Sequence, residues 1–117
     1  MTKNNTKQRI VWPVAMAIAA IGLAAPAQAE ECNDVHEIEI THVFTPGDAY
    51  AKPGDCFHFT NVHMIEHSAV GMDREFNTGI LMPNGTAWLR FDEPIVIPYV
   101  CGVHPLMTGV LVVEDEE

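Results

Sequence analysis

A cysteine, a histidine and a methionine stand at intervals of three residues near the C-terminal end of the chain, as Cys101, His104 and Met107. Their side chains offer a thiolate, an imidazole and a thioether, a soft donor set that suits copper better than magnesium or calcium. His67 is placed to add a second imidazole, because an apolar segment with the pattern of a strand follows it. One cysteine, two histidines and a weak axial methionine are the donors of blue-copper electron-transfer sites. The sequence therefore predicts a metal site made of His67, Cys101, His104 and Met107.

Each of these residues also has a purely structural interpretation. A cysteine in a strand is often a small buried hydrophobe, and a methionine often fills a core. For Cys101, the fixed offsets to His104 and Met107 favour a ligand instead. His63 is a rival to His67 for the first histidine position, and the apolar strand expected directly after His67 favours the latter.

The N-terminal residues have the pattern of a secretory signal peptide. Three basic residues precede an uncharged apolar run from Val11 to Leu23, and Ala27-Gln28-Ala29 matches an A-x-A cleavage site. The apolar run is shorter than the ~18 residues that a spanning helix usually needs, so we expect no stable membrane insertion after cleavage. Residues 1–29 are thus predicted to be removed on export, leaving residues 30–117 as one periplasmic domain.

The mature chain expected from this cleavage is strongly acidic. It keeps three basic residues against all sixteen acidic ones, so its net charge falls from −10 to −13. Nucleic-acid binding is excluded as a function, because contact with phosphates calls for clustered Lys and Arg. The negative charge would instead steer positively charged partners. The residues that we expect to face such a partner are Asp73, Glu75, Asp92 and Glu93.

The mature chain also shows the alternation and turn chemistry of short β-strands. From Val35 to Phe44, apolar residues alternate with polar ones, as in a half-buried strand. Pro-Gly-Asp turns follow at positions 46–48 and 53–55. The further strands expected are Cys56–Thr60, Ser68–Met72, Ala87–Phe91, Ile95–Val100 and Thr108–Val113. Since no segment has a convincing helical period, we predict an all-β domain, an antiparallel or mixed β-sandwich.

A longer pattern contains the candidate ligands. It consists of Pro53-Gly54-Asp55, Phe57-x-Phe59-Thr60-Asn61, His67, Phe76-x-x-Gly79-x-Leu81, Phe91 and Tyr99-x-Cys101-x-x-His104-Pro105-x-Met107-x-Gly109. This pattern resembles the plastocyanin/azurin family of cupredoxins, and the seven-residue loop from Cys101 to Met107 is similar to that of the amicyanins. The resemblance implies a cupredoxin-type Greek-key β-sandwich with a type 1 copper site.

The resemblance also implies a function. It indicates a monomeric periplasmic electron carrier, not an enzyme, with one copper that cycles between Cu(I) and Cu(II). The expected partner is a basic c-type cytochrome or a periplasmic oxidoreductase. In the family, the imidazole that corresponds to His104 reaches the surface through an apolar patch, to which Leu106, Met82 and Pro83 would belong. In the alternative, Leu106 packs inward and braces the loop.

Ser68 departs from the family pattern, because it follows His67 at a position where asparagine is common. The hydrogen bonds that tie the two ligand segments together are therefore expected to differ from those of the family.

A different function stays open because the chain has further histidines. A second copper site could form from His36, His42, His58 and His63 together with Met64. The protein would then serve copper resistance or copper delivery in the periplasm.

The remaining cysteines form an even pair. With Cys101 assigned to the metal, Cys32 and Cys56 are left in an oxidising compartment, where disulfides persist. In the resembling fold the strands that these residues begin run side by side, so the resemblance favours a disulfide. Two separate thiols are the alternative.

Overall fold

The computed structural model describes residues 31–115. The predicted signal peptide, residues 1–29, lies outside this range, as do the last two residues of the chain. Within the described range no helix is found with the length and hydropathy needed to cross a bilayer.

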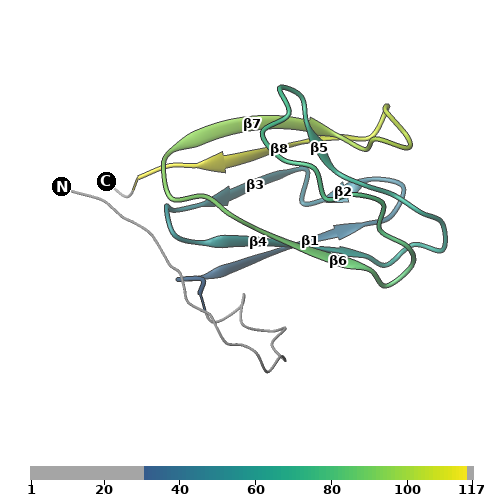
Figure 1. Cartoon of the computed structure of the whole chain (residues 1–117), viewed down its shortest axis with the longest axis horizontal. Coiled ribbons are helices and arrows are strands. Elements are labelled where there is room, and N and C mark those ends of the chain that lie inside the picture. Colours follow the sequence, from purple (N-terminus) through teal and green to yellow (C-terminus); the bar gives the residue numbers. More distant parts are fainter. Residues whose placement is uncertain (1–30, 116–117) are drawn as a thin grey trace, which may run out of the picture. The chain divides into compact units, whose positions relative to one another are not determined.

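The described residues form eight β-strands in two four-stranded sheets (Figure 1). The strands are β1 (Val35–Ile40), β2 (Phe44–Thr45), β3 (Asp48–Ala51), β4 (Cys56–Asn61), β5 (Val70–Gly71), β6 (Thr86–Arg90), β7 (Ile95–Val100) and β8 (Thr108–Val113). One sheet has the order β2-β1-β4-β6 and the other the order β3-β8-β7-β5. From β2 to β7 every connection passes from one sheet to the other. The predicted all-β sandwich is confirmed.

Pairing within the sheets is mixed. β1 runs parallel to β4, from Val35 beside Cys56 to Ile40 beside Asn61, and β3 runs parallel to β8. β6 is antiparallel to β4, and β7 is antiparallel to β8. Hydrogen bonds described below connect Asn61, the last residue of β4, to the segment that contacts Cys101. We therefore distinguish the Cys101 end of the sandwich from the opposite end, the Cys56 end.

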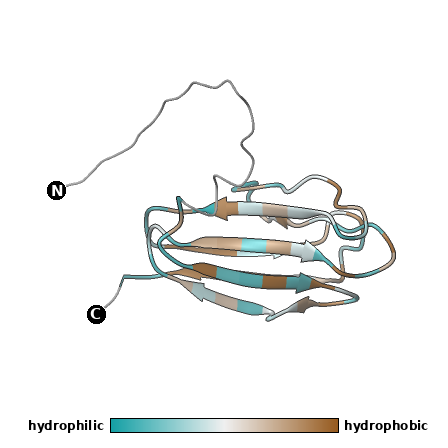
Figure 2. Ribbon diagram, turned by 90° about the horizontal axis from the view of Figure 1, so that it is seen from below, coloured by the Kyte–Doolittle hydropathy of each residue, from teal (hydrophilic) through white to brown (hydrophobic). Residues whose placement is uncertain are grey.

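Alternating apolar residues fill the space between the sheets. Ile38 of β1, Phe57 and Phe59 of β4, and Tyr99 of β7 are fully buried. Figure 2 shows hydrophobic and hydrophilic segments following one another along single strands. The ring of Tyr99 packs edge-to-face against that of Phe59, with centroids 5.7 Å apart. Each large side chain buried in this way contributes about 1.5–3 kcal/mol to folding, so the residues just before Cys101 belong to a firmly packed core.

The first predicted strand is interrupted. It was expected to run from Val35 to Phe44, but β1 ends at Ile40, because the Thr41 N–H donates to the Val43 carbonyl and the chain turns back. The returning segment is β2, which pairs antiparallel with β1. The short strand β3 after the turn at positions 46–48 was not predicted at all, since its four residues carry little periodic signal.

The predicted strand Ser68–Met72 is reduced to the two residues of β5. The N–H of Ser68 donates to the sulfur of Cys101, and that of Ala69 donates to the hydroxyl of Thr78. Because both groups are engaged outside the sheet, the strand begins only at Val70. The departure from regular pairing therefore lies directly beside the predicted metal ligands.

The predicted disulfide is present between Cys32 and Cys56, with the two Cα atoms 5.4 Å apart. The parallel register of β1 and β4 brings Val35 beside Cys56, and the Cys56 N–H donates to the Asp34 carbonyl. The alternative of two separate thiols is wrong. Cys101 is the free cysteine of the described residues, and it is buried.

A buried carboxylate closes the turn before β4. Asp55 Oδ2 accepts hydrogen bonds from the Lys52 backbone N–H at 3.0 Å and from His36 Nε2 at 2.9 Å. Gly54 allows the turn, with a φ of 92° that strains other residues. Burial alone would raise the pKa of Asp55, but these hydrogen bonds and the nearby charges of His36 and Lys52 hold it below its ordinary value of 3.8.

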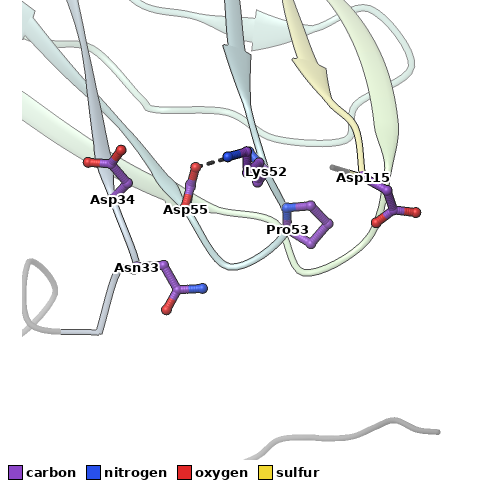
Figure 3. Close-up of a pocket in the computed structure, with 6 residues that line it drawn as sticks. All are labelled: Asn33, Asp34, Lys52, Pro53, Asp55 and Asp115. Carbon is purple, nitrogen blue, oxygen red and sulfur yellow. Dashed lines mark hydrogen bonds between the residues drawn. The ribbon is translucent and has the colours of Figure 1, made fainter. Parts of the chain in front are cut away.

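The same turn borders an open depression of about 520 Å³ at the Cys56 end (Figure 3). The residues that line it are Asn33, Asp34, Lys52, Pro53, Asp55 and Asp115.

We expect Asp55→Asn to lower the free energy of unfolding by about 1–3 kcal/mol near neutral pH, because two buried hydrogen bonds to a carboxylate are weakened. The carboxylate has a lower pKa in the folded than in the unfolded state. Its contribution is therefore complete above about pH 4 and is lost as the pH falls through the folded-state pKa. Urea unfolding at a series of pH values measures the difference. Asp115→Asn, an exposed change on the same depression, is the control. Two results would contradict the assignment: equal effects of the two substitutions, or a difference in unfolding free energy between wild type and Asp55→Asn that grows as the pH falls.

Candidate metal centre

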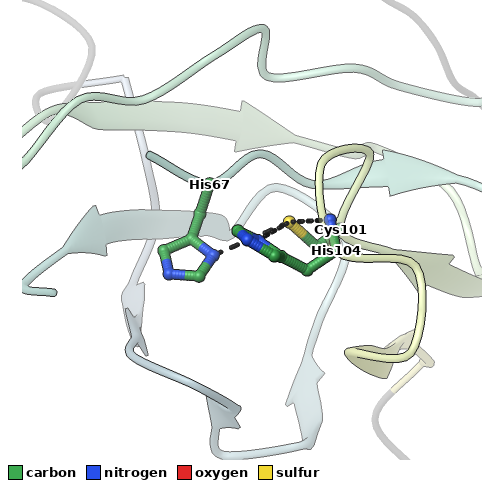
Figure 4. A group of neighbouring side chains, drawn as sticks. All are labelled: His67, Cys101 and His104. Carbon is green, nitrogen blue, oxygen red and sulfur yellow. Dashed lines mark hydrogen bonds between the residues drawn. The ribbon is translucent and has the colours of Figure 1, made fainter. Parts of the chain in front are cut away.

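Three of the four predicted ligands converge at the Cys101 end (Figure 4). The sulfur of Cys101 lies 3.7 Å from His67 Nδ1 and 3.8 Å from His104 Nδ1. All three donor atoms lie within 4.8 Å of one another. Cys101 and His104 follow β7, whereas His67 comes from a segment 34 residues before Cys101. The fold thus joins two distant parts of the sequence at one point.

These spacings fit three ligands around one metal ion. Metal–nitrogen and metal–sulfur bonds to a first-row metal are about 2.1 and 2.3 Å long. At an angle of about 120°, as in a trigonal His₂Cys site, they separate the two donor atoms by about 3.8 Å. The distances from the Cys101 sulfur to the two imidazole nitrogens agree with this value. The donor set and its geometry therefore suit copper.

A tight loop places His104 beside Cys101. The Cys101 N–H donates to the Met107 carbonyl at 3.0 Å, and the Met107 N–H donates to the His104 carbonyl at 2.9 Å. Met107 is half-buried and packs against the core. The loop therefore holds all three C-terminal donor residues in one turn, although the role of Met107 as a fourth ligand stays a prediction.

Two backbone N–H groups point at the sulfur of Cys101. One comes from His104 in the same loop and the other from Ser68 in the distant segment, each 3.4 Å from the sulfur. Hydrogen bonds to the charged form of a group favour that form, so both stabilise a thiolate. A thiolate, and not a thiol, binds metal.

Ser68 makes a second connection between the two segments. Its hydroxyl oxygen accepts a hydrogen bond from the Gly102 N–H at 2.9 Å. A side chain at position 102 would meet that oxygen, because a Cβ there would lie 2.8 Å from it. Ser68, which stands where asparagine is common in the family, thus makes a direct hydrogen bond between the two ligand segments.

His67 is held by a pair of backbone hydrogen bonds and by a buried amide. It exchanges N–H···O bonds with Leu81, at 3.1 and 2.7 Å. The side-chain amide of Asn61, which is fully buried at the end of β4, donates to the carbonyls of Ile65 and Leu81 at 2.9 and 2.8 Å. From the sequence, Asn61 has no predicted role. The feature that could have indicated one is a polar residue at the end of a strand rich in buried residues.

The environment of His67 favours a neutral imidazole. The residue is 1% exposed. Burial, together with the nearby His104 and His63, lowers the pKa of His67. A neutral ring keeps one nitrogen lone pair free, and metals bind that form. His67 presents Nδ1 to the Cys101 sulfur, whereas its rival His63 lies against His67.

Among the described residues, the further histidines do not gather into the second copper site that the sequence leaves open. That site would have combined His36, His42, His58, His63 and Met64. In the described structure His36 bonds to Asp55 at the Cys56 end, and His58 bonds through Nδ1 to Glu37 at 2.9 Å. His63 lies at the other end, against His67. These histidines are thus committed to separate local contacts.

Part of the predicted acidic patch is misplaced. Asp92 and Glu93 connect β6 to β7, and β6 ends at Arg90 opposite Cys56. They therefore lie at the Cys56 end, away from His104, so they do not border a partner seated over His104. Whether they face a partner stays a prediction. The sequence could not show this, because it does not reveal the direction in which β6 crosses its sheet.

The surface beside His104 is apolar. Leu106 is 97% exposed, which excludes the alternative in which it packs inward. Met82 is also exposed, at 58%, and it follows Leu81, the partner of His67 in the backbone pair. Pro83, the next residue, is exposed as well. We name Pro105, Leu106, Met82 and Pro83 the apolar face.

Comparison with known proteins gives related sequences and structures. No family model matches the chain. Amicyanin-alpha from Methylorubrum extorquens is 29% identical over 103 residues, which cover 84% of this chain and 86% of the relative.

Solved structures with the same arrangement are more numerous. A purple cupredoxin from Nitrosopumilus maritimus superposes with a TM-score of 0.65 at 21% identity, covering 68% of this chain and 99% of the other. A reduced amicyanin variant superposes with a TM-score of 0.63 at 24% identity, covering 74% and 89%. With the two-sheet topology, these similarities establish that the chain has a cupredoxin-like fold.

Proposed function

We propose that the protein is an exported type 1 copper protein that passes one electron at a time between redox partners. The observation that carries this proposal is the group of His67, Cys101 and His104, whose donor atoms lie within 4.8 Å of one another at one end of the sandwich. The named relatives, an amicyanin and a purple cupredoxin, support the same function.

In this proposal His67, Cys101 and His104 would hold the copper, and Met107 would be a further, weaker ligand. Copper, when bound, supplies the one-electron couple between Cu(II) and Cu(I). The residues of the chain hold the thiolate and both imidazoles in place. The N–H groups of Ser68 and His104 stabilise charge on the sulfur, and the bonds of Asn61 and Leu81 fix the position of His67.

The scaffold favours rapid electron transfer because it limits movement of the ligands. Cys101 directly follows β7, in which the preceding core residue Tyr99 is fully buried. His67 is buried as well. Ligands anchored in this way keep one arrangement in both oxidation states, so little energy is spent on rearrangement.

The compartment and the oligomeric state belong to the same proposal. The signal peptide predicted at residues 1–29 supports export to the periplasm. The disulfide between Cys32 and Cys56 agrees with an oxidising compartment. We propose a monomeric carrier without enzymatic activity, since the group at Cys101 provides ligands for one metal.

The apolar face is the proposed docking site for redox partners. It includes Pro105 and Leu106, the exposed residues directly after the half-buried His104, so a partner seated on it would come close to the metal ligands. Redox encounters are small and transient. The negative net charge of the chain would attract a basic partner such as a c-type cytochrome, with a periplasmic oxidoreductase as the other candidate.

Copper resistance or delivery is the competing function, and it calls for more than one copper per chain. Because the further histidines make separate contacts, we favour the electron carrier.

The ligand assignment predicts distinct effects for two substitutions. Cys101→Ser should abolish the intense visible band of the copper-loaded protein, because that band arises from the thiolate. Met107→Leu should retain copper and colour with a raised reduction potential, since a donor to Cu(II) is lost. Visible spectra, redox titration and copper analysis measure these outcomes, and the wild type should bind one copper. A band that survives in the Cys101 variant, or a stoichiometry above one, would refute the proposal.

The docking site predicts that Leu106→Lys lowers the rate constant for electron exchange with a basic c-type cytochrome about tenfold, equal to about 1.4 kcal/mol of docking free energy. Added salt should slow the wild-type reaction. Stopped-flow kinetics measures both effects. Val96→Lys is the matched control, because Val96 is 62% exposed on β7, away from the apolar face. If both variants slow exchange equally while they remain folded and coloured, the docking face is wrong.

A further inference from the structure

His63 lies directly against the ligand His67. Its Nδ1 is 3.0 Å from His67 Nε2, a hydrogen-bonding distance. The two rings are inclined by only 14°, with centroids 5.2 Å apart. The other nitrogen of His67, Nδ1, is the one that faces the Cys101 sulfur. Both nitrogens of His67 therefore have an assigned neighbour, one on each side of the ring.

The loop between β4 and β5 holds His63 in this position. The His63 N–H donates to Asn61 Oδ1 at 2.9 Å. The amide group of the same Asn61 side chain donates to the carbonyls of Ile65 and Leu81. One buried amide thus ties together the backbone of His63 and the backbone bridge between His67 and Leu81. Within residues 31–115, His63 is the hydrogen-bond partner found for His67 Nε2.

The chemistry of neutral imidazole gives this contact a direction. One ring nitrogen carries a proton and the other a lone pair. If Nδ1 of His67 offers its lone pair to a metal, the proton is on Nε2, and Nε2 must donate. The acceptor within reach is Nδ1 of His63. His63 then carries its own proton on Nε2.

We propose that His63 is a positioning residue for the metal centre: it accepts the Nε2–H of His67 and so fixes the tautomer and ring orientation of that ligand. The inference rests on the proposed copper-binding function. Metal-bound histidines commonly donate their second N–H to a carboxylate, a carbonyl or water, and such contacts raise the basicity of the ligand. Here a neighbouring imidazole supplies the acceptor. His63, the rival ligand in sequence terms, thus acts on the metal through His67.

Two substitutions separate the hydrogen bond from the ring contact. His63→Phe keeps a planar ring but removes the acceptor. His63→Asn removes the ring but retains an acceptor oxygen separated from Cα by the same number of bonds as Nδ1. We expect His63→Phe to lose about 10–100-fold in Cu(II) affinity, the usual effect of removing such a partner. The reduction potential depends on the ratio of the Cu(II) and Cu(I) affinities. It should rise by about 59 mV for each factor of ten by which the loss of Cu(II) affinity exceeds the loss of Cu(I) affinity. His63→Asn should retain most of the affinity.

Chelator competition and redox titration of the three proteins measure these changes, with His58→Phe as control. His58 lies on the outer face of its sheet, stacked on Trp88, so its replacement should leave affinity and potential unchanged. Unchanged affinity in His63→Phe would overturn the proposal. Equal losses in His63→Phe and His63→Asn would also overturn it, because the acceptor oxygen retained in His63→Asn would then not preserve the affinity.

Nitrogen NMR of the metal-free wild type tests the hydrogen bond without any substitution. At a pH where both rings are neutral, we expect the His67 proton on Nε2, with a coupling across the hydrogen bond to Nδ1 of His63. A proton on Nδ1 of His67 would overturn the proposal. A wild-type protein that binds copper without a thiolate band would contradict the proposed function, and the NMR result would still decide the histidine pair.

Discussion

The sulfur of Cys101 is held by backbone hydrogen bonds from two segments that lie far apart in the sequence. The N–H of His104 belongs to the loop after β7, and the N–H of Ser68 belongs to the segment before β5. The first donor is the backbone N–H of His104 itself, and the second belongs to Ser68, the residue after His67. Both histidines face the sulfur. The contacts that stabilise the thiolate are therefore the contacts that bring the imidazoles together, and the arrangement depends on both segments at once.

Hydrogen bonds and core packing of the sandwich hold this arrangement. Asn61 ends β4 and binds the carbonyls around His67, while Leu81 pairs with the backbone of His67 itself. On the other side, Tyr99 anchors β7 in the core two residues before Cys101. Both ligand segments are therefore anchored in the folded sandwich. Under the proposed function, this anchoring limits the rearrangement that a change of oxidation state would otherwise cause.

The sequence predicts local features of this site well. Cys101, His104 and Met107 lie within one loop, so their spacing alone indicates a shared role. The disulfide follows from the number of cysteines once Cys101 is assigned, together with the family resemblance. His67 can be chosen over His63 only weakly, because its position depends on the pairing with Leu81, 14 residues later in the chain.

Features that depend on the path of the chain could not be predicted. The break between β1 and β2 follows from a turn at Thr41 that keeps the alternating pattern intact. The place of Asp92 at the Cys56 end follows from the direction of β6. The bond between Ser68 and Gly102 shows that serine replaces the family's asparagine without loss of the connection.

X-ray absorption at the copper edge of the wild-type protein, loaded with one copper, tests the central claim most directly. The account predicts one sulfur at short distance and two imidazole nitrogens around the metal, supplied by Cys101, His67 and His104. Scattering from nitrogen and oxygen alone, with no short sulfur, would contradict it.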